Sequence, residues 1–296
     1  MIKFKTALLV TILSLFLNFA PNPLSANGLP VFVSILPQKY FVQQIGKDRV
    51  VVQVMVQPGA SPATYEPKPA QMTALAKARI YFSIGVPFEK VWLGKIAAAN
   101  PRMALVATDR GILKLPMNAH GHDHADNSGE DHAHGTEDPH IWTSPPLVMS
   151  QARNILVALQ TYDPANSEYY EANYKQFINE LIDLDARLRQ ILADKQGTSF
   201  LVFHPSWGYF ANTYGLRQIA IEFEGKDPKP AHLQELIDHA RKERIRAIFA
   251  QPQFSSKNAE IVARAIDGKV IAADPLAADW SSNLLNQAKQ FKAAMR

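Results

Sequence analysis

Short apolar runs alternate with amphipathic segments along most of this chain of 296 residues. The runs have the length of buried strands, and the segments between them have the apolar spacing of helices. Strands are predicted at residues 31–35, 50–56, 80–84, 200–203, 218–223, 245–249 and 269–272. Helices are predicted at residues 69–78, 86–99, 230–243, 255–266 and 281–295. This alternation predicts βαβ units with mainly parallel sheets, and therefore an α/β fold.

The longest helical pattern lies between the two halves of the chain, at residues 164–194. Asp163 is a favourable N-cap, Pro164 suits the first turn, and Gly197 supplies a stop. Apolar residues recur at spacings of three and four, at Tyr170, Tyr174, Phe177, Leu181, Leu184, Leu188 and Ile191. A coiled-coil dimer is one interpretation, but the pattern holds only about three heptads. We expect instead a monomer in which a stiff helix of roughly 46 Å runs along both halves and limits hinge motion.

The first 26 residues have the three parts of a secretory signal peptide. Lys3 and Lys5 precede an apolar run at residues 6–20, and residues 24–26 (Leu-Ser-Ala) form a small-residue cleavage site. A membrane-spanning helix is the alternative, but it needs about 20 apolar residues. Removing the two lysines lowers the formal net charge from +4 to +2. No basic block remains that would predict binding to nucleic acid.

The chain contains no cysteine. An exported protein of about 270 residues buries a core large enough to fold without a disulfide. A lipoprotein anchor requires a cysteine at the processing site, so we expect a freely soluble protein in the periplasm. Any metal site must then be built from His, Asp and Glu side chains.

Residues 118–138 form a loop-like stretch rich in histidine, and residues 120–140 hold six of the nine histidines of the chain. Neutral imidazole is a common ligand of zinc, and tracts of this composition are typical of metal capture. A solvated linker or an expression tag are the alternatives, but a tag would lie at a terminus and would lack the acidic residues found between the histidines. The histidines expected to form an accessory metal site are His120, His122, His124, His132 and His134.

Three further residues are candidate metal ligands because of where they stand in the chain. His204 and Asp274 directly follow predicted strands, and ligands of open α/β sheets bind outside the carboxyl ends of strands. His140 follows an Asp-Pro turn sequence. Each could be an ordinary turn residue, but together, beside a histidine-rich loop in an exported protein, they favour a metal site. His232 and His239 are seven residues apart on one predicted helix, so we interpret them as surface or packing residues, since helical ligand pairs are spaced by four.

Several motifs resemble those of the zinc/manganese solute-binding proteins of ABC importers. They are Tyr65-Glu66-Pro67, Asp138-Pro139-His140-Ile141-Trp142, Phe203-His204-Pro205-Ser206-Trp207-Gly208-Tyr209-Phe210, Glu224-Gly225-Lys226-Asp227-Pro228 and Asp274-Pro275-Leu276. The resemblance covers essentially the whole chain after residue 26, in order. It implies two Rossmann-like α/β lobes, at residues 27–163 and 195–296, joined by one long rigid helix at residues 164–194.

The same resemblance implies that zinc is the bound substrate, held in the cleft between the lobes, and that a membrane permease is the partner. His140 is then the ligand from the first lobe, and His204 and Asp274 are the ligands from the second. Manganese-type relatives carry a carboxylate where His204 stands, so an imidazole there favours zinc over manganese. Glu222 and Glu224 are expected to line the cleft or to orient His204, with a structural role for Glu224.

The chain departs from this resemblance at one ligand position. Relatives place a histidine just before the Tyr-Glu-Pro motif, where this chain has Ala63. A methyl group cannot bind a metal, so three of the four expected ligands remain. Water, Glu66 or a loop histidine could fill the fourth position; water needs no rearrangement of the chain and is our first expectation, and a loop histidine is the second. Trp142 and Trp207 are expected to wall off the site.

The expected function is capture of zinc by a periplasmic solute-binding protein and its delivery to an ABC importer. A zinc metalloenzyme with an open site of two histidines and one aspartate is one alternative, because catalytic zinc keeps a position open for water. The sequence shows no convincing general base, Walker loop or nucleophile elbow, so we expect no catalysis. A metal-buffering chaperone is the other alternative, and it would not need a surface for a permease.

Overall fold

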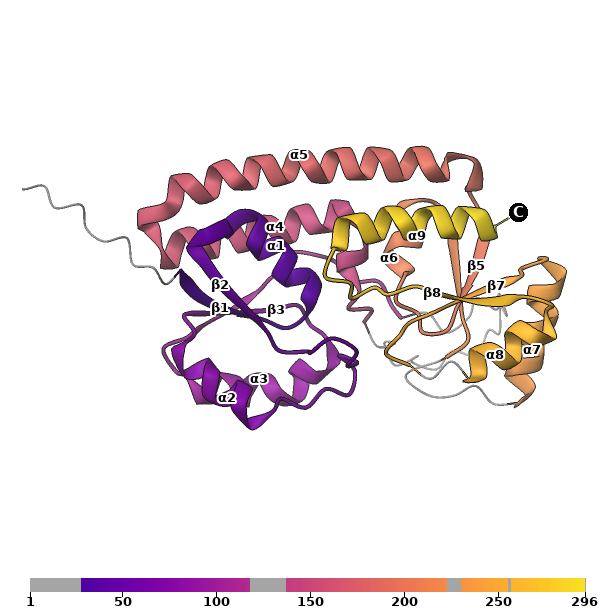
Figure 1. Ribbon diagram of the computed structural model, residues 1–296, viewed down its shortest axis with the longest axis horizontal. Coiled ribbons are helices and arrows are strands. Elements are labelled where there is room, and N and C mark those ends of the chain that lie inside the picture. Colours follow the sequence, from indigo (N-terminus) through magenta and orange to yellow (C-terminus); the bar gives the residue numbers. More distant parts are fainter. Residues whose placement is uncertain (1–27, 118–136, 223–229, 255–256, 296) are drawn as a thin grey trace, which may run out of the picture.

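The computed structural model describes residues 28–117, 137–222, 230–254 and 257–295. These residues form two lobes, each built on a four-stranded parallel sheet (Figure 1). The α/β class with two parallel-sheet lobes is therefore confirmed. The expected signal peptide, the loop histidines and Glu224 lie outside the described residues. Among the helices of the described part, none is long and apolar enough to cross a membrane.

The first lobe carries its sheet between two pairs of helices. Its strands, in the order β2-β1-β3-β4, are β1 (Leu29–Val33), β2 (Val50–Val54), β3 (Ile80–Ser83) and β4 (Ala104–Ala107). One face is covered by α1 (Leu36–Gly46) and α4 (Pro145–Tyr162), and the other by α2 (Pro69–Ala74) and α3 (Pro87–Ala99) (Figure 1). Every residue of β3 is buried, as expected for a central strand of a parallel sheet covered on both faces.

The second lobe repeats this arrangement of strands. Its strands, in the order β6-β5-β7-β8, are β5 (Ser199–Val202), β6 (Arg217–Ala220), β7 (Ala247–Ala250) and β8 (Lys269–Ala272). One face carries α6 (Gly208–Thr213) and α9 (Trp280–Ala294), and the other carries α7 (Pro230–Lys242) and α8 (Lys257–Ala265) (Figure 1). Phe200 and Val202 point into a core that is continuous with the first lobe, whereas Leu201 points into a separate core under α7 and α8.

Four elements were not among those predicted from the sequence, namely α1, β4, α4 and α6. β4 and α6 have four and six residues, which is too short for a hydrophobic period to be recognised. α1 and α4 have prolines, Pro37 and Pro145, in their first turns. Proline is tolerated there because that backbone N–H has no helical partner, although in a sequence it resembles a turn.

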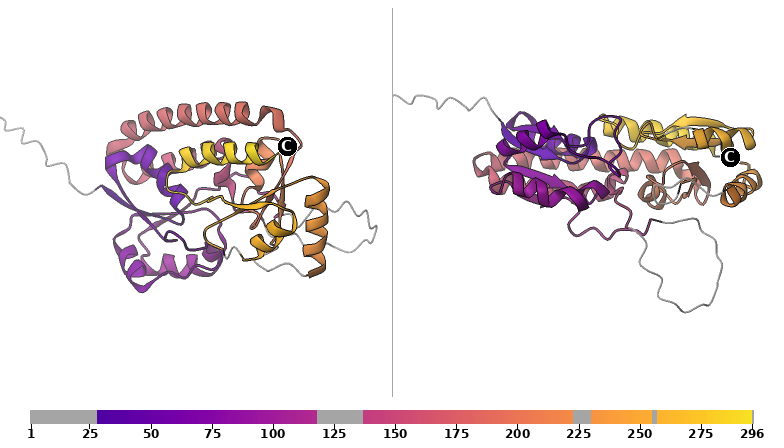
Figure 2. Two further views of the ribbon diagram at one scale, coloured as in Figure 1. Left: turned by 45° about the vertical axis from the view of Figure 1, so that its right-hand side comes forward. Right: turned by 90° about the horizontal axis from the view of Figure 1, so that it is seen from below.

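The long helix α5 (Ser167–Leu192) runs beside both lobes (Figures 1 and 2). It contacts α1 and α4 in the first lobe and α9 in the second. The predicted continuous helix at residues 164–194 is divided in the structure, because 3-10 turns occupy Pro164–Asn166 and Ala193–Lys195. Asp163 does not cap α5, since its carboxylate accepts hydrogen bonds from the Tyr170 hydroxyl at 2.5 Å and from Asn166 Nδ2 at 2.8 Å. The buried stripe of α5 is Tyr170, Phe177, Leu181, Leu184, Leu188 and Leu192.

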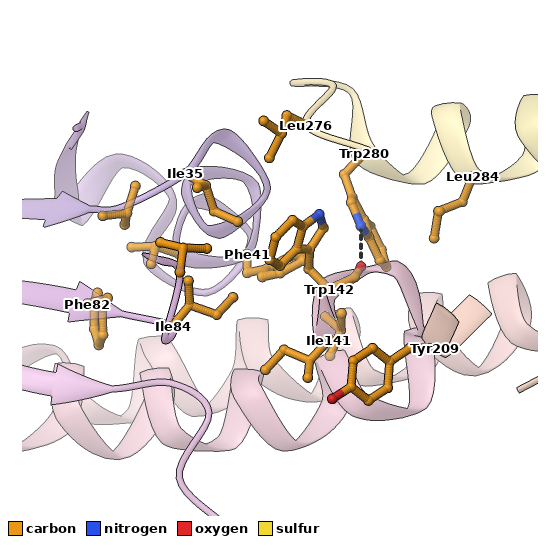
Figure 3. Close-up of a cluster of buried hydrophobic side chains, with 14 of the residues drawn as sticks. Ile35, Phe41, Phe82, Ile84, Ile141, Trp142, Tyr209, Leu276, Trp280 and Leu284 are labelled. Carbon is orange, nitrogen blue, oxygen red and sulfur yellow. Dashed lines mark hydrogen bonds between the residues drawn. The ribbon is translucent and has the colours of Figure 1, made fainter. Parts of the chain in front are cut away.

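Two buried tryptophans join the lobes at their boundary (Figure 3). Trp142 Nε1 donates to the carbonyl of Pro275 at 2.8 Å, and Trp280 Nε1 donates to the carbonyl of Trp142 at 2.8 Å. The Trp280 ring also meets the Phe41 ring edge-on, with centroids 5.0 Å apart. A third hydrogen bond between the lobes comes from the Tyr209 hydroxyl, which donates to the carbonyl of Asp138 at 2.9 Å. These contacts connect residues that are more than 70 positions apart in the chain.

Buried polar side chains fill the crevice of the first lobe, where the strand order reverses between β1 and β3. Gln38 Nε2 donates to the carbonyl of Ser83 at 3.1 Å and to Thr108 Oγ1 at 3.0 Å. Glu89 accepts hydrogen bonds from the Ser34 hydroxyl and, at 2.7 Å, from the Gly85 N–H. Such a crevice is where open α/β sheets usually bind ligands. In this lobe the protein's own side chains occupy it.

Glu89 should make the stability of the protein dependent on pH. Burial raises the pKa of this carboxyl from its ordinary 4.5 to about 7, against the lowering effect of its hydrogen bonds from Ser34, Gly85 and Ile84. Because the raised value belongs to the folded state, its contribution is complete below about pH 4.5 and is lost as the pH rises through 7. The free energy of unfolding should therefore fall across this range, by at most about 3 kcal/mol from this group.

Urea unfolding of the parent and of Glu89→Gln between pH 5 and pH 8 would measure this effect. The variant should lose the part of the pH dependence that Glu89 contributes. Glu168→Gln, which changes an exposed carboxyl on α5, is the control and should keep the slope of the parent. Equal slopes in the parent and in Glu89→Gln would contradict the prediction.

Candidate metal centre

His140 and His204 come from opposite lobes and meet at the boundary between them. His140 lies immediately before the 3-10 turn Ile141–Thr143 that leads into α4. His204 lies just past the carboxyl end of β5, beside β7, at the point where the strand order of the second sheet reverses. The candidate ligand His204 thus stands in the crevice of the second sheet, where open α/β sheets usually bind ligands, whereas the crevice of the first sheet is filled by side chains. The ring centroids of the two histidines are 5.3 Å apart, and their planes are inclined by 72°.

Each imidazole is oriented by a buried carboxylate. His140 Nδ1 donates to Asp138 Oδ1 at 2.7 Å, and His204 Nδ1 donates to Glu222 Oε2 at 3.2 Å. A proton on Nδ1 leaves the lone pair on Nε2 for a metal, which is the usual arrangement of a metal-binding histidine and its carboxylate partner. Two imidazoles that bind one tetrahedral zinc ion at about 2.1 Å have ring centroids roughly 5 Å apart. The observed pair already has that spacing.

The backbone on either side of His204 is fixed by one glutamine. Gln251 Oε1 accepts a hydrogen bond from the His204 N–H at 3.2 Å, and Gln251 Nε2 donates to the His204 carbonyl at 2.7 Å and to Ser206 Oγ at 2.7 Å. Phe254 stacks on the His204 ring with centroids 4.7 Å apart. Burial lowers the pKa of His204 and nearby His140 lowers it further, while the hydrogen bond to Glu222 acts in the opposite direction. The net lowering favours the neutral imidazole, which is the form that coordinates a metal.

Asp274 lies past the carboxyl end of β8, as predicted, but it does not join the two histidines. β7 lies between β5 and β8, so side chains at the ends of β5 and β8 start roughly 10 Å apart. Asp274 Oδ1 accepts hydrogen bonds from Gln253 Nε2 at 2.8 Å and from the Leu276 N–H at 2.9 Å. Within the described residues, no group of three His, Asp or Glu side chains is close enough to hold one metal ion.

Two neighbouring cavities lie at the lobe boundary. The larger, of about 590 Å³, is lined by both histidines, and we call it the metal cavity. The smaller, of about 230 Å³, is lined by Asp274 and by residues of the first lobe around Gln57. Gln253 lines both cavities, so its side chain stands between the carboxylate of Asp274 and the imidazoles.

The structure gives different positions to the residues proposed for the fourth ligand. Ala63 lines the metal cavity together with the two histidines. Glu66 is exposed and is not among the residues that line this cavity. The loop histidines lie outside the described residues.

The remaining sequence candidates separate into two groups. Trp142 lines the metal cavity, as expected, and Glu222 both lines it and orients His204. The expectation that Trp207 walls off the site is wrong, because its ring is fully buried in the core of the second lobe against Phe210 and Phe291. His239 is exposed on α7 and lines a different cavity, in agreement with its interpretation as a surface residue.

Sequence analysis did not identify the side chains that hold the two histidines. Asp138 belongs to the Asp-Pro-His motif, and a carboxylate two residues before a candidate ligand is a recognisable signal. Gln251 and Gln253 follow the strand β7, so the rule that placed His204 and Asp274 at strand ends also applied to them. No sequence feature indicated the stacking of Phe254 on His204.

Two parallel-sheet lobes with a pair of oriented imidazoles between them have the architecture of a two-lobed binding protein, and the imidazole pair is its candidate metal site. The chain belongs to the family described as zinc-uptake complex component A, periplasmic, whose model matches residues 31–294. The high-affinity zinc uptake system protein ZnuA of Bacillus subtilis is 29% identical over 247 residues, which cover 82% of this chain and 77% of that protein.

Solved structures agree with this family membership. A crystal structure of ZnuA superposes with a TM-score of 0.82 at 43% sequence identity, covering 90% of this chain and 99% of its own. A crystal structure of a ZnuA deletion mutant with zinc bound gives a TM-score of 0.83 at 43% identity, covering 90% and 98%. The family is named for a component of metal uptake and not for an enzyme activity.

The role of Asp138 can be tested by removing its charge. Asp138→Asn should weaken zinc binding by about 10- to 100-fold, because the carboxylate that fixes the tautomer and orientation of His140 is lost. Competition against a zinc-binding indicator would measure the affinity. Glu137→Gln changes the charge of an exposed neighbour by the same amount and should leave the affinity unchanged. Equal losses in both variants would point to a general effect of charge, contrary to the prediction.

Proposed function

We propose that this protein captures zinc at the boundary between its lobes and delivers it to the membrane permease of an ABC importer. The observation that carries the proposal is the pair His140 and His204. The two imidazoles come from different lobes, each has its Nδ1 on a buried carboxylate, and their spacing suits one tetrahedral ion. Such a pair binds a soft-to-intermediate cation, which favours zinc over manganese.

The proposed ligands are His140, His204 and Asp274, with water in the fourth position beside Ala63. Asp274 would have to exchange its hydrogen bond from Gln253 for the metal, since its Oδ1 is held in the neighbouring cavity. Glu66 is the weaker candidate for the fourth ligand because it is exposed and lies away from the cavity wall. A histidine from the loop at residues 118–138 is the other candidate.

The role we propose is transport and not catalysis. Asp138 and Glu222 are the carboxylates that contact the imidazole pair, and each is engaged in orienting a histidine. We further propose that residues 1–26 are a cleaved signal peptide, that residues 27–163 and 195–296 are the two domains, and that the mature protein is a periplasmic monomer that binds no nucleic acid. Uptake of radioactive zinc by native cells with and without the intact gene, in zinc-depleted medium, would distinguish transport from metal buffering.

Loss of either imidazole should remove tight zinc binding. His140→Ala and His204→Ala each leave a site with too few protein ligands to retain a four-coordinate ion. Equilibrium dialysis of the purified protein would give both affinity and stoichiometry. His239→Ala, on the exposed surface of α7, should behave like the parent. The ligand assignment is wrong if the double variant still holds one zinc ion as tightly as the parent with its loop removed.

The histidine-rich loop should add binding capacity of low affinity. Deleting residues 120–134 should lower the number of zinc ions bound per chain and leave about one tight site, because loop histidines must lose conformational entropy on each capture. Zinc titration of the parent and of the deletion variant would show this. If the deletion instead abolished all tight binding, a loop histidine would have to be part of the principal site.

A further inference from the structure

The metal cavity supplies fewer ligands than a zinc ion needs. Among the described residues, the cavity brings together the imidazoles of His140 and His204, and no group of three His, Asp or Glu side chains is close enough to hold one ion. Glu222 also lines the cavity, but its Oε2 accepts the hydrogen bond from His204 Nδ1. Ala63, whose side chain has no donor atom, is part of the wall. The carboxylate of Asp274 is held at the neighbouring, smaller cavity by two hydrogen bonds. Zinc is almost always four-coordinate. Two positions on an ion bound by this pair are therefore left for groups other than these side chains.

The cavity is also much larger than a hydrated ion requires. Its volume is about 590 Å³, whereas one water molecule occupies about 30 Å³ in the liquid. Pockets that bind small organic molecules typically measure about 300–1,000 Å³. The walls are largely apolar, and they include Pro62, Val86, Pro87, Met117, Trp142 and Phe254. Such walls offer bound water few hydrogen bonds, but they can pack against the carbon skeleton of an organic ligand.

The charges around the pair restrict what such a ligand can be. Asp138 and Glu222 place two carboxylates behind the imidazoles, and no lysine or arginine lines the described wall of the cavity. These carboxylates already balance the charge of one divalent ion. A ligand that adds several negative charges would be repelled, whereas an amino acid adds only one carboxylate together with an amine. Nitrogen is also a donor that zinc accepts readily.

We infer that this cleft takes its zinc together with a small amino-carboxylate chelator, which supplies the two coordination positions that the imidazole pair leaves open while Asp274 keeps its hydrogen bond from Gln253. The inference rests on the proposed zinc-binding function, and it gives the chelator the two positions that Asp274 and water would take around the ion alone. His140 and His204 bind the ion, the amine and carboxylate of the chelator complete the coordination, and the apolar wall beside Ala63 accommodates its side chain. The transported species is then a zinc complex and not the ion alone.

Native mass spectrometry and equilibrium dialysis of the full chain would test this inference with three probes: zinc alone, zinc with L-histidine, and zinc with citrate. With L-histidine we expect a species that contains one protein, zinc and histidine, and zinc retention at least about tenfold tighter than with zinc alone. Citrate, which carries several carboxylates and no amine, should form no such species. The same measurements on His140→Ala separate this site from any zinc held elsewhere, because the ternary species should disappear there.

Two substitutions at Ala63 form a matched pair of similar bulk. Ala63→His should add a protein ligand, strengthen the binding of zinc alone by about 10-fold or more, and abolish the gain from L-histidine. Ala63→Leu fills the same space without a donor atom, so it should lose the ternary species and gain no affinity for zinc alone.

The inference is overturned if the parent holds one zinc ion at the His140-dependent site without the mass of histidine, and if added L-histidine only removes zinc from it. That result would leave the proposed zinc transport intact. If no zinc binds in a manner that depends on His140 with any of the probes, the proposed function fails as well, so the two failures can be told apart.

Discussion

Two imidazoles on different lobes can bind one ion only if the lobes keep a fixed spacing, and the rest of the structure depends on this constraint. Trp142 lies two residues after His140 and donates a hydrogen bond to the carbonyl of Pro275 on the opposite lobe. Trp280 returns a hydrogen bond to the carbonyl of Trp142. The segment that carries His140 is thereby fixed directly to the second lobe. The helix α5 adds rigidity over a longer distance, because it packs on helices of both lobes.

Within this frame, short hydrogen-bonded units determine where the histidines point. Asp138 and His140 are close in sequence, and one turn sets both the backbone and the ring, since Asp138 Oδ1 accepts from the N–H and from Nδ1 of His140. The second histidine needs partners from two other strands, Glu222 after β6 and Gln251 after β7. The orientation of His140 is thus set locally, and that of His204 depends on the assembled sheet.

This difference explains how far the sequence alone could predict the structure. Hydrophobic periodicity located seven of the eight strands of the described part and the long helix. The predicted helix begins three residues too early and ends two residues too late. The rule of strand carboxyl ends correctly placed His204 and Asp274 at one edge of a sheet. It could not give the strand order, which separates the two residues by β7 and gives Asp274 a glutamine as its neighbour. The wrong expectation for Trp207 has a related cause. Its neighbours in the core are Phe210 and Phe291, and not His204, which precedes it by three residues.

The two lobes share one strand order, yet only one of them keeps its crevice open. In the first lobe, the equivalent space is closed by Gln38 and Glu89, whose side chains satisfy the backbone groups at the ends of β1 and β3. The first lobe therefore offers a ready location for an engineered second binding site. Shortening these two side chains would uncover a polar recess at the position that matches the cavity beside His204 in the other lobe. The change would lower the free energy of unfolding, and the pair His140 and His204 would remain untouched.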